Sequence, residues 1–242
     1  MRAPEVLSLL RACAAALMLA AGSLASAAPP AGTAQKIGII GTGHIGGSLA
    51  KLWVESGHEV LISSRHPEQL RALAATLGPN AHVGTARDAA LFGEVVLISV
   101  PYKALPELGQ QLRAELAGKV VLDTCNPYPE RDGPMAVDVR REGTGVASPR
   151  LLPGVRLVRA FNAIGFRDLQ RLAHREGAPP VAIPLAGDDA DALKVAAQLV
   201  RDAGFEPVVV GSLSRAREFD VGTYPYTHVL TADELRQNLA VK

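Results

Sequence analysis

The sequence predicts an α/β fold: a Rossmann-type, doubly wound and mostly parallel sheet with a short C-terminal extension. Three observations support this prediction. Short apolar runs alternate with segments of helical periodicity along the chain. A glycine-rich loop of the form G-x-G-x-x-G follows the first of these apolar runs and opens a helix. The chain has 242 residues, 48% of them apolar, so one large domain with a sizeable core is feasible.

The predicted strands are short and mostly apolar. The run at 95–100 is almost unbroken, as expected for a strand that is covered on both faces of its sheet. The expected strands fall at 36–40, 59–62, 82–84, 95–100, 120–123, 155–160, 181–186 and 206–210.

The predicted helices start and stop at residues that favour helix ends. Pro67 opens one helix, and Thr85, with Asp88 three residues later, is a candidate cap for another. Asp188 stands at the start of a third helix and Gly204 follows its end. These helices cover 45–55, 67–78, 85–91, 103–116 and 188–203, and the tail after 214 should hold a short helix, an aromatic loop and a C-terminal helix. We expect residues 126–153, rich in Gly and Pro, to be irregular.

The first residues have the composition of a secretory signal peptide. Arg2 and Arg11 precede an apolar run at 12–21, and Ala25-Ser26-Ala27 has the small-x-small shape of a cleavage site. This pattern predicts an exported, periplasmic protein. The alternatives are an uncleaved anchor, or a misassigned start codon ahead of a cytoplasmic protein. The corresponding division of the chain is a signal peptide at 1–28, a linker at 29–35 and one domain at 36–242.

Composition excludes several classes of partner. The formal net charge is only +1, so no strong field attracts nucleic acid or an anionic membrane. Aromatic residues make up 4% of the chain, too few for a platform that stacks bases. Cys13 and Cys125 provide no disulfide framework, and the six histidines lack the spacing of metal ligands. We therefore expect no nucleic acid, no metal and, after signal cleavage, no membrane contact.

The glycine loop predicts a site for a dinucleotide. Gly41 permits the tight turn, Gly43 lets a pyrophosphate approach the backbone, and Gly46 lets the helix pack close to the strand. The helix N-terminus then offers free amides to the phosphates. The alternative is a glycine-rich turn without a ligand, but the strand–loop–helix–strand context favours the dinucleotide.

The tip of the second strand indicates which dinucleotide is bound. An acid at this tip would accept hydrogen bonds from the hydroxyls of the adenine ribose, but the chain has Ser63, Ser64 and Arg65. A guanidinium suits a phosphate, and the two hydroxyls can donate further hydrogen bonds. The tip therefore predicts NADP rather than NAD. The alternative is a surface arginine with ordinary turn serines.

The carboxyl ends of the later strands should line the second half of the site, because ligands of such sheets bind there. Pro101 would stiffen a loop beside the nicotinamide ribose. Asn126 and Asn162 can each donate and accept hydrogen bonds, which suits a carboxamide or a carbonyl-bearing ring. The alternatives are ordinary turn chemistry for Asn126 and a helix cap for Asn162.

The candidates for chemistry are few: Asn126, Asn162 and His44, which points either at phosphate or at the acceptor. Cys125 has no basic neighbour in the sequence and is more simply explained as a buried thiol. Tyr224 and Tyr226 either wall the acceptor pocket or anchor the tail. No general acid–base pair stands out, which suits hydride transfer between conjugated rings, a reaction that depends mainly on alignment.

With these residues in place, the chain resembles the NADPH-dependent reductases of the deazaflavin coenzyme F-420. The resemblance runs from Lys36 to about Tyr226. Its N-terminal part is also similar to pyrroline-5-carboxylate reductase and to the reductase domain of membrane metalloreductases. The matching segments are KIGIIGTGHIGGSLA, LISSR, LISVPYKALPEL, VVLDTCNPY, VRAFNAIGF and AGDDADALKVAAQLVRDAGF.

The resemblance implies a single Rossmann-type domain, often dimeric, that moves a hydride between NADPH and a flavin-like ring. By the same resemblance, residues of three segments contact the coenzyme: Thr42, His44 and Ile45 in the phosphate loop, Ser64 and Arg65 at the 2′-phosphate, and Val100 and Pro101 at the nicotinamide.

Three functions stay open on the sequence. The first is an NADP-dependent oxidoreductase that acts on a flavin, a deazaflavin or another small conjugated acceptor. The second is a non-catalytic NADP-binding module. The third is an imine or carbonyl reductase resembling pyrroline-5-carboxylate reductase, although the tail after Gly211 is short for the helical dimerisation domain of that family.

Overall fold

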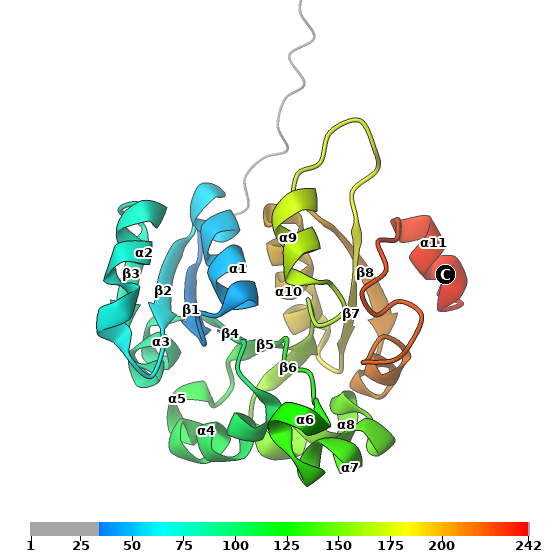
Figure 1. Ribbon diagram of the computed structural model, residues 1–242, viewed down its shortest axis with the longest axis horizontal. Helices are drawn as coiled ribbons and strands as arrows, with labels where there is room; N and C mark the ends of the chain where they lie inside the picture. The colour runs from blue at the N-terminus through cyan, green and yellow to red at the C-terminus, as the bar shows by residue number, and fades with distance from the viewer. Residues whose placement is uncertain (1–33, 242) are drawn as a thin grey trace, which may run out of the picture. The chain divides into compact units, whose positions relative to one another are not determined.

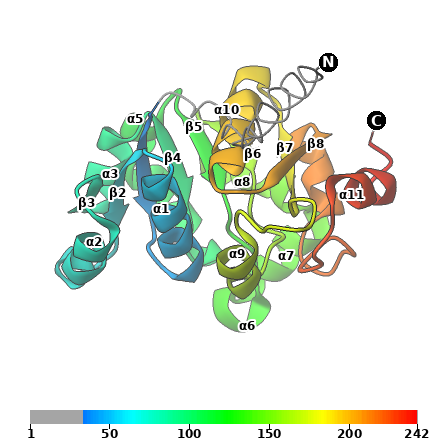
Figure 2. The same ribbon diagram turned by 90° about the horizontal axis from the view of Figure 1, so that it is seen from above.

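The computed structural model describes residues 34–241, which form one eight-stranded sheet in the order β3-β2-β1-β4-β5-β6-β7-β8. Strands β3 and β8 lie at its two ends (Figure 2). The strands are β1 (Lys36–Ile40), β2 (Glu59–Ser63), β3 (Ala81–Gly84), β4 (Val95–Ile98), β5 (Val120–Asp123), β6 (Arg156–Arg159), β7 (Ala182–Gly187) and β8 (Glu206–Gly211).

The strands are parallel except at one pair, where β7 runs antiparallel to β6. The sheet is built outward from β1: Ile37 pairs with Val60 of β2 on one side and with Val95 of β4 on the other. The strand order therefore reverses direction at β1, between β2 and β4. Such a switch point is where α/β sheets bind ligands, and the predicted fold class is confirmed.

Helices cover both faces of the sheet. One face carries α1, α2, α9 and α10, and the other carries α3–α5, α7 and α8; helices α4–α8 gather in green at the bottom of Figure 1. Short 3-10 helices lie at Pro67–Leu70, Tyr102–Ala104 and Leu213–Glu218. The α-helices are α1 (His44–Glu55), α2 (Arg71–Leu77), α3 (Ala86–Phe92), α4 (Leu105–Gln111), α5 (Arg113–Leu116), α6 (Pro129–Asp132), α7 (Pro134–Glu142), α8 (Thr144–Leu151), α9 (Phe166–Leu172), α10 (Ala190–Asp202) and α11 (Ala232–Asn238).

The larger hydrophobic core lies under α1, α9 and α10 and joins the two halves of the sheet. Trp53 of α1 is fully buried, and its indole Nε1 donates to the carbonyl of Leu199 on α10 at 2.8 Å. Nearby, the buried ring of His58 lies 3.0 Å from Asp202 at the end of α10. The first half of the chain is thus anchored to a helix from the second half by packing and by polar contacts.

The expectation that residues 126–153 are irregular is wrong. This segment forms α6, α7 and α8. Pro129 and Pro134 occupy first helical turns, where a missing N–H costs nothing. Gly133 and Gly143 adopt positive φ angles of 75° and 96° and separate consecutive helices. The residues that were interpreted as helix breakers therefore mark the boundaries of short helices.

The helix caps follow the sequence in one case and differ in another. Thr85 and Asp88 form the capping box that their spacing predicts. The cap of α10 is Asp189, whose carboxylate accepts from the amide of Ala192, and not Asp188. Asp188 instead accepts from the amide of Leu213, so it connects the start of α10 to the tail.

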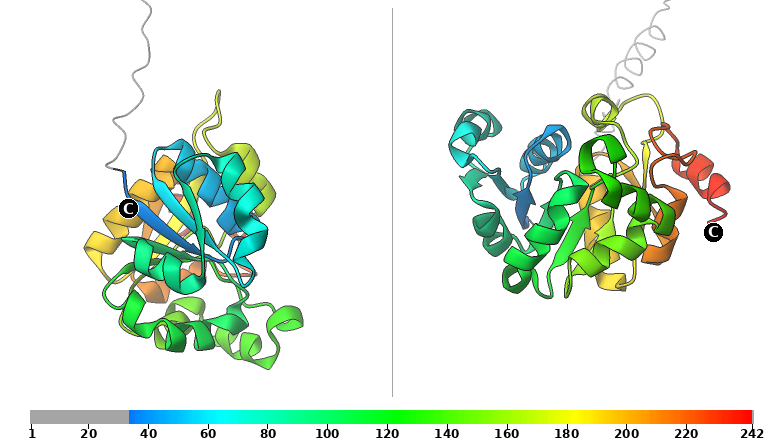
Figure 3. Two further views of the ribbon diagram at one scale, coloured as in Figure 1. Left: turned by 90° about the vertical axis from the view of Figure 1, so that its left-hand side faces the viewer. Right: turned by 60° about the horizontal axis from the view of Figure 1, so that its bottom comes forward.

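The tail returns to the sheet after β8. It forms the 3-10 helix at 213–218, a loop with Tyr224 and Tyr226, and α11, which packs beside β7 and β8 (red in Figure 3). Within residues 34–241, none of the helices has the length and apolarity needed to cross a bilayer. The predicted signal peptide lies outside the described residues, so the signal and the division at 28 and 35 stay predictions.

Candidate functional site

The glycine loop is held against the tip of β2 by its own backbone. Gly41 has a φ of 97°, and its amide and that of Thr42 both donate to the carbonyl of Ser63. A Cβ at Gly46 would lie 2.1 Å from the carbonyl oxygen of Gly41, so the first turn of α1 touches the loop directly. A Cβ at Gly43 would meet no protein atom within 4 Å. The three glycines therefore have the geometry that the motif predicts.

Helix α1 begins at His44, so its free amides face the open side of the loop. The His44 ring is exposed and stacks on Phe166 at the start of α9, with ring centroids 4.4 Å apart. The Ser48 hydroxyl donates to the His44 carbonyl and accepts from Gln170 of α9. The phosphate loop is thus braced by α9, a helix that the sequence analysis did not delimit and whose Phe166 it did not single out.

The tip of β2 divides its three candidates. The Ser63 side chain is fully buried, and its hydroxyl donates to the Ile39 carbonyl at 2.8 Å. The prediction that Ser63 contacts a phosphate is therefore wrong, because this side chain points into the sheet. Ser64 is half-buried, and its hydroxyl accepts from the His66 amide. Arg65 is exposed and forms no hydrogen bond or ion pair with any residue in 34–241.

The loop after β4 lies beside the glycine loop, as expected from the sheet order. A Cβ on Gly41 would lie 2.7 Å from Cγ1 of Val100, so Val100 borders the loop directly. Pro101 is exposed and precedes the buried Tyr102, whose hydroxyl lies 2.9 Å from that of Ser148 on α8. Val100 and Pro101 therefore lie next to the phosphate loop, and the contact between Tyr102 and Ser148 fixes the chain that follows them.

Asn126 and Asn162 lie next to each other, but they have different roles. The Asn126 Nδ2 donates to the Asn162 carbonyl at 2.8 Å, and its Oδ1 is buried without a hydrogen-bond partner among the described residues. Asn162 is only 2% exposed, and its Nδ2 donates to the Phe219 carbonyl. With so little free surface, Asn162 supports Asn126 and the tail. Its Oδ1, like that of Asn126, is buried without a hydrogen-bond partner among the described residues, so a part for Asn162 in the chemistry stays a prediction. The cap of α9 is Gly165 and not Asn162.

Cys125 is not activated. The thiol is buried, and burial followed by the nearby Asp123 carboxylate raises its pKa well above the usual range. A thiol in this environment stays protonated at neutral pH and is a poor nucleophile. This agrees with its interpretation as a buried side chain.

A pair of tyrosines connects the tail to the segment that follows β5. The hydroxyls of Tyr128 and Tyr226 are hydrogen-bonded to each other, and the guanidinium of Arg131 lies 5.0 Å from the Tyr128 ring centre. Burial raises the pKa of Tyr226, and the Tyr128 hydroxyl raises it further. Tyr224 is 56% exposed and stacks on His228 instead. Tyr226 thus anchors the tail, whereas Tyr224 faces outward; Tyr128 was missed because the segment around it was expected to be irregular.

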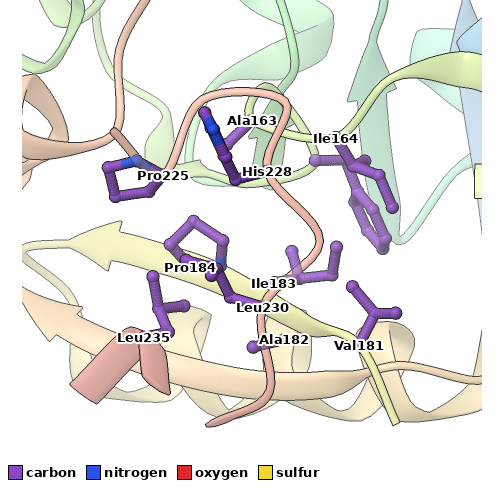
Figure 4. A pocket seen from close by; sticks show the side chains of 11 residues that line it. Ala163, Ile164, Val181, Ala182, Ile183, Pro184, Pro225, His228, Leu230 and Leu235 are labelled. Carbon is purple, nitrogen blue, oxygen red and sulfur yellow. The ribbon is translucent and has the colours of Figure 1, made fainter. Parts of the chain in front are cut away.

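Two hollows border these residues. The one in Figure 4 lies between β7 and the loop that carries Pro225 and His228, and its volume of about 10 Å³ admits a single water molecule and no ring. A larger groove of about 560 Å³ starts at Gly43 and His44 and runs along α1 between α2 and α9. The open groove is the one that adjoins the phosphate loop.

This arrangement defines a class of protein: a Rossmann-type oxidoreductase with a dinucleotide loop at the switch point of its sheet. Residues 36–127 match the family model described as "NADP oxidoreductase coenzyme F420-dependent". The chain is 30% identical over 194 residues to the F420-dependent NADP reductase of Methanothermobacter thermautotrophicus, which covers 76% of this chain and 84% of that protein. The chain belongs to the coenzyme F420-dependent NADP oxidoreductase family.

Two further similarities agree with this family. The chain is 33% identical over 190 residues to metalloreductase STEAP3 of Rattus norvegicus; the match covers 77% of this chain and only about a third (36%) of that longer protein. The crystal structure of the hypothetical protein SMa0349 from Sinorhizobium meliloti superimposes with a TM-score of 0.71 and 25% identity. That superposition covers 82% of this chain and 95% of the other. The protein is thus an enzyme of an NADP-dependent family, as predicted.

Proposed function

We propose that the protein transfers a hydride between NADP(H) and a small conjugated acceptor, a flavin-like or deazaflavin ring. The observation that carries this proposal is the position of Arg65, an exposed guanidinium at the tip of β2, beside a glycine loop that is open at Gly43. The relatives point the same way, because one is named an F420-dependent NADP reductase and another a metalloreductase.

The phosphate end of the site is made of backbone. The open face at Gly43 gives a pyrophosphate room to approach, and the amides at the start of α1 would donate to it. The Thr42 hydroxyl already donates to the Ser63 carbonyl at 3.0 Å, so this side chain holds the loop in shape. Rigid amides of this kind bind phosphate oxygens without first losing conformational freedom.

The adenosine end selects the phosphorylated coenzyme. Arg65 has no competing carboxylate partner in residues 34–241, so its fork is available to a 2′-phosphate. The hydroxyl of Ser64 accepts from the His66 amide and still has its own hydrogen to donate. Ser63 contributes through its carbonyl, which fixes the glycine loop beside these two side chains.

The acceptor end is centred on Asn126. Only the amide nitrogen can donate to the Asn162 carbonyl, so the orientation of the Asn126 side chain is fixed and its Oδ1 remains a free acceptor. A buried oxygen without a partner favours a ligand that brings an N–H, such as a carboxamide or the edge of a flavin-like ring. NADPH supplies the hydride when bound, and the protein aligns the two rings.

The first experiment tests the reaction itself. Purified protein is mixed with NADPH in a stopped-flow instrument, and oxidation is followed at 340 nm against deazaflavin, FMN, FAD, a quinone and ferric citrate. Rapid oxidation by one of the ring acceptors supports the proposal. If NADPH binds but no acceptor oxidises it, the proposal is wrong, and the result favours a non-catalytic NADP-binding module or an imine or carbonyl reductase.

The second experiment tests the choice of coenzyme. A charge-assisted hydrogen bond contributes about 1.5–3 kcal/mol, so Arg65→Glu should weaken NADPH binding by at least ~10-fold. It should not weaken NADH binding, because a carboxylate at this tip can accept hydrogen bonds from the ribose hydroxyls. Arg113→Glu is the matched control, because it changes the net charge equally from an exposed position on α5, on the opposite face of the sheet from α1. Calorimetry with both coenzymes measures the result; an unchanged preference for NADPH in Arg65→Glu would contradict the proposal.

We further propose that the protein is exported after cleavage of a signal peptide and that it forms a homodimer. A cleaved signal predicts a native N-terminus near residue 28, which N-terminal sequencing of the native protein detects. A native protein that keeps Met1 would favour the uncleaved anchor, and one that begins at a later start codon would favour the cytoplasmic alternative. Light scattering measures whether the purified protein is a homodimer, as the family resemblance implies.

A further inference from the structure

Strand β6 ends in a charged residue that is completely buried. Arg159 has no exposed surface, and neither has Asp123 beside it on β5. A guanidinium in a protein interior costs several kcal/mol of desolvation unless charged partners and hydrogen bonds compensate it. Hydrophobic packing alone therefore does not explain why a buried arginine stands at the end of β6, next to the candidate site.

Arg159 holds the chain just before Asn126. Its Nη1 donates to the carbonyls of Asp123 at 3.1 Å and of Cys125 at 3.0 Å. The same nitrogen lies 2.8 Å from Asp123 Oδ2, as an ion pair whose N–H bonds are directed at the two carbonyls. The other carboxylate oxygen of Asp123 accepts from the Cys125 amide. The amide of Cys125 is thus held by Asp123 and its carbonyl by Arg159, so both peptide groups that precede Asn126 have fixed orientations.

The opposite end of the guanidinium faces the tail. Arg159 Nη2 lies 3.6 Å from Oδ1 of Asp220. Asp220 in turn accepts from the Thr144 amide at 2.9 Å and from the Thr144 hydroxyl at 2.6 Å, at the start of α8. One side chain thus connects the end of β5, the tail after the 3-10 helix at 213–218, and α8.

Two of these segments, the end of β5 and the tail, also contact each other through the chain that follows β6. Asn126 donates to the carbonyl of Asn162, and Asn162 donates to the carbonyl of Phe219, the neighbour of Asp220. Further along the tail, the Thr227 amide donates to the Ala163 carbonyl at 2.7 Å, one residue beyond Tyr226. Movement of the tail relative to β5 would therefore displace Asn126 and Tyr226 together.

A guanidinium suits this position better than an ammonium. Its Nη1 contacts the two carbonyls and the Asp123 carboxylate, while Nη2 lies 3.6 Å from the Asp220 carboxylate, and one ammonium nitrogen cannot occupy both places. Nε and Nη2 form no hydrogen bond with the described residues. Burial alone would lower the pKa of Arg159, but Asp123 and Asp220 raise it overall, so the group keeps its charge.

We propose that Arg159 is a positioning residue of the acceptor end: it sets Asn126 and the tail in the geometry that aligns the acceptor ring with the nicotinamide. This inference rests on the proposed function. It requires that loss of the fork affects turnover of the acceptor far more than binding of NADPH, because the phosphate loop and Arg65 lie on other elements.

The test compares Arg159→Lys and Asp220→Asn with Arg156→Lys. Arg156 is the matched control because it lies at the other end of β6, where it makes a two-pronged ion pair with Asp189. Asp220→Asn keeps the size of the side chain and removes the charge that faces Arg159, together with one of the two acceptors for Thr144, so it stays informative if Arg159→Lys folds poorly. The measurements are the Kd for NADPH, the kcat and KM for the best acceptor, and thermal unfolding.

A fourth measurement does not depend on turnover. Cys125 is 2% exposed and is held by Arg159 through its carbonyl, so its labelling by Ellman's reagent reports on the loop directly. The labelling is done on full-length protein with Cys13→Ser, so that Cys125 is the remaining thiol.

The expected result has three parts. Arg159→Lys and Asp220→Asn bind NADPH with a Kd within about twofold of wild type. Both variants lose at least ~10-fold in kcat, because the acceptor ring is misaligned. In Arg159→Lys, Ellman's reagent labels Cys125 at least ~10-fold faster than in wild type. Arg156→Lys behaves as wild type in each. Unchanged kcat and unchanged labelling in Arg159→Lys overturn the inference. If none of the tested acceptors oxidises NADPH in the presence of the wild-type protein, the proposed function fails. The labelling then tests the role of Arg159 by itself: an unchanged labelling rate of Cys125 in Arg159→Lys overturns that role.

Discussion

Replacing Gly46 by alanine should destabilise the protein, although alanine is the better helix former. A Cβ at Gly46 would lie 2.1 Å from the carbonyl oxygen of Gly41 and 3.3 Å from Cγ2 of Ile39. Real Cβ atoms essentially never approach closer than 3.0 Å, so helix and loop would have to separate by nearly an ångström. The obstacle is backbone, which cannot rotate away as a flexible side chain does.

The size of the effect follows from two opposing contributions. Overpacking against a fixed group costs up to about 3 kcal/mol. Replacing glycine by alanine inside a helix returns about 1 kcal/mol. The net loss is about 2 kcal/mol, which lowers the melting temperature of a domain of this size by about 4–8 °C.

Two neighbouring glycines are the controls. At Gly47 the nearest atoms lie 3.8 and 3.9 Å from a Cβ, so Gly47→Ala should gain about 1 kcal/mol of helix propensity. At Gly43, the N-terminal cap of α1, a Cβ meets nothing within 4 Å, so Gly43→Ala should lose at most about 1 kcal/mol, the lower preference for alanine at a cap. It should bind NADPH at least ~10-fold more weakly, since its methyl group occupies the approach of the pyrophosphate. Scanning calorimetry and coenzyme titration measure both. A Gly46→Ala variant that melts at or above wild type would refute the reasoning.

Three further predictions follow from single contacts. Burial would raise the pKa of Asp132, but hydrogen bonds, led by that of Arg131, lower it overall. The stability that results is complete above the unfolded pKa near 4 and is lost as the pH falls further. The urea midpoint of Asp132→Asn should therefore change less between about pH 5 and 3 than that of wild type. Trp53→Phe removes the indole donor to the Leu199 carbonyl, which still accepts from the Ala203 amide, so the loss of this hydrogen bond should cost about 0.5–1.5 kcal/mol in urea unfolding; an unchanged midpoint would show that it contributes nothing. Cys125→Ala should leave the rate of NADPH oxidation within about twofold of wild type, because a thiol whose pKa is raised by burial takes no part; a large loss would assign it a role.

The glycine loop and its strand could be predicted from the sequence because their geometry is set locally. Gly41 needs a positive φ, and Gly46 needs to lack a side chain; both requirements act between residues a few positions apart. The capping box at Thr85 is local in the same sense. Structural requirements that act between residues a few positions apart produce sequence patterns from which the element can be predicted.

The errors have a different origin. Ser63 was assigned to the ligand because of its place in the sequence, but the side to which a strand-end side chain turns depends on the sheet around it; here the hydroxyl finds the Ile39 carbonyl. Gly145 was counted as a loop residue, yet its missing Cβ lets α8 approach the Leu213 carbonyl, where a Cβ would lie 1.7 Å away. The role of Arg159 depends on Asp220, some sixty residues later. Such long-range partners leave no local pattern.

The buried contact between Trp53 and α10 has a consequence for anyone who would transplant the coenzyme-binding part. The segment that the family model matches, 36–127, ends before α10, which covers the indole. Expressed alone, this segment would expose Trp53 and the apolar side of α1 to water, and such an exposed hydrophobic patch promotes aggregation. A transferable unit therefore needs α10 to cover Trp53, and the end of the family-model match at residue 127 is not a boundary of folding.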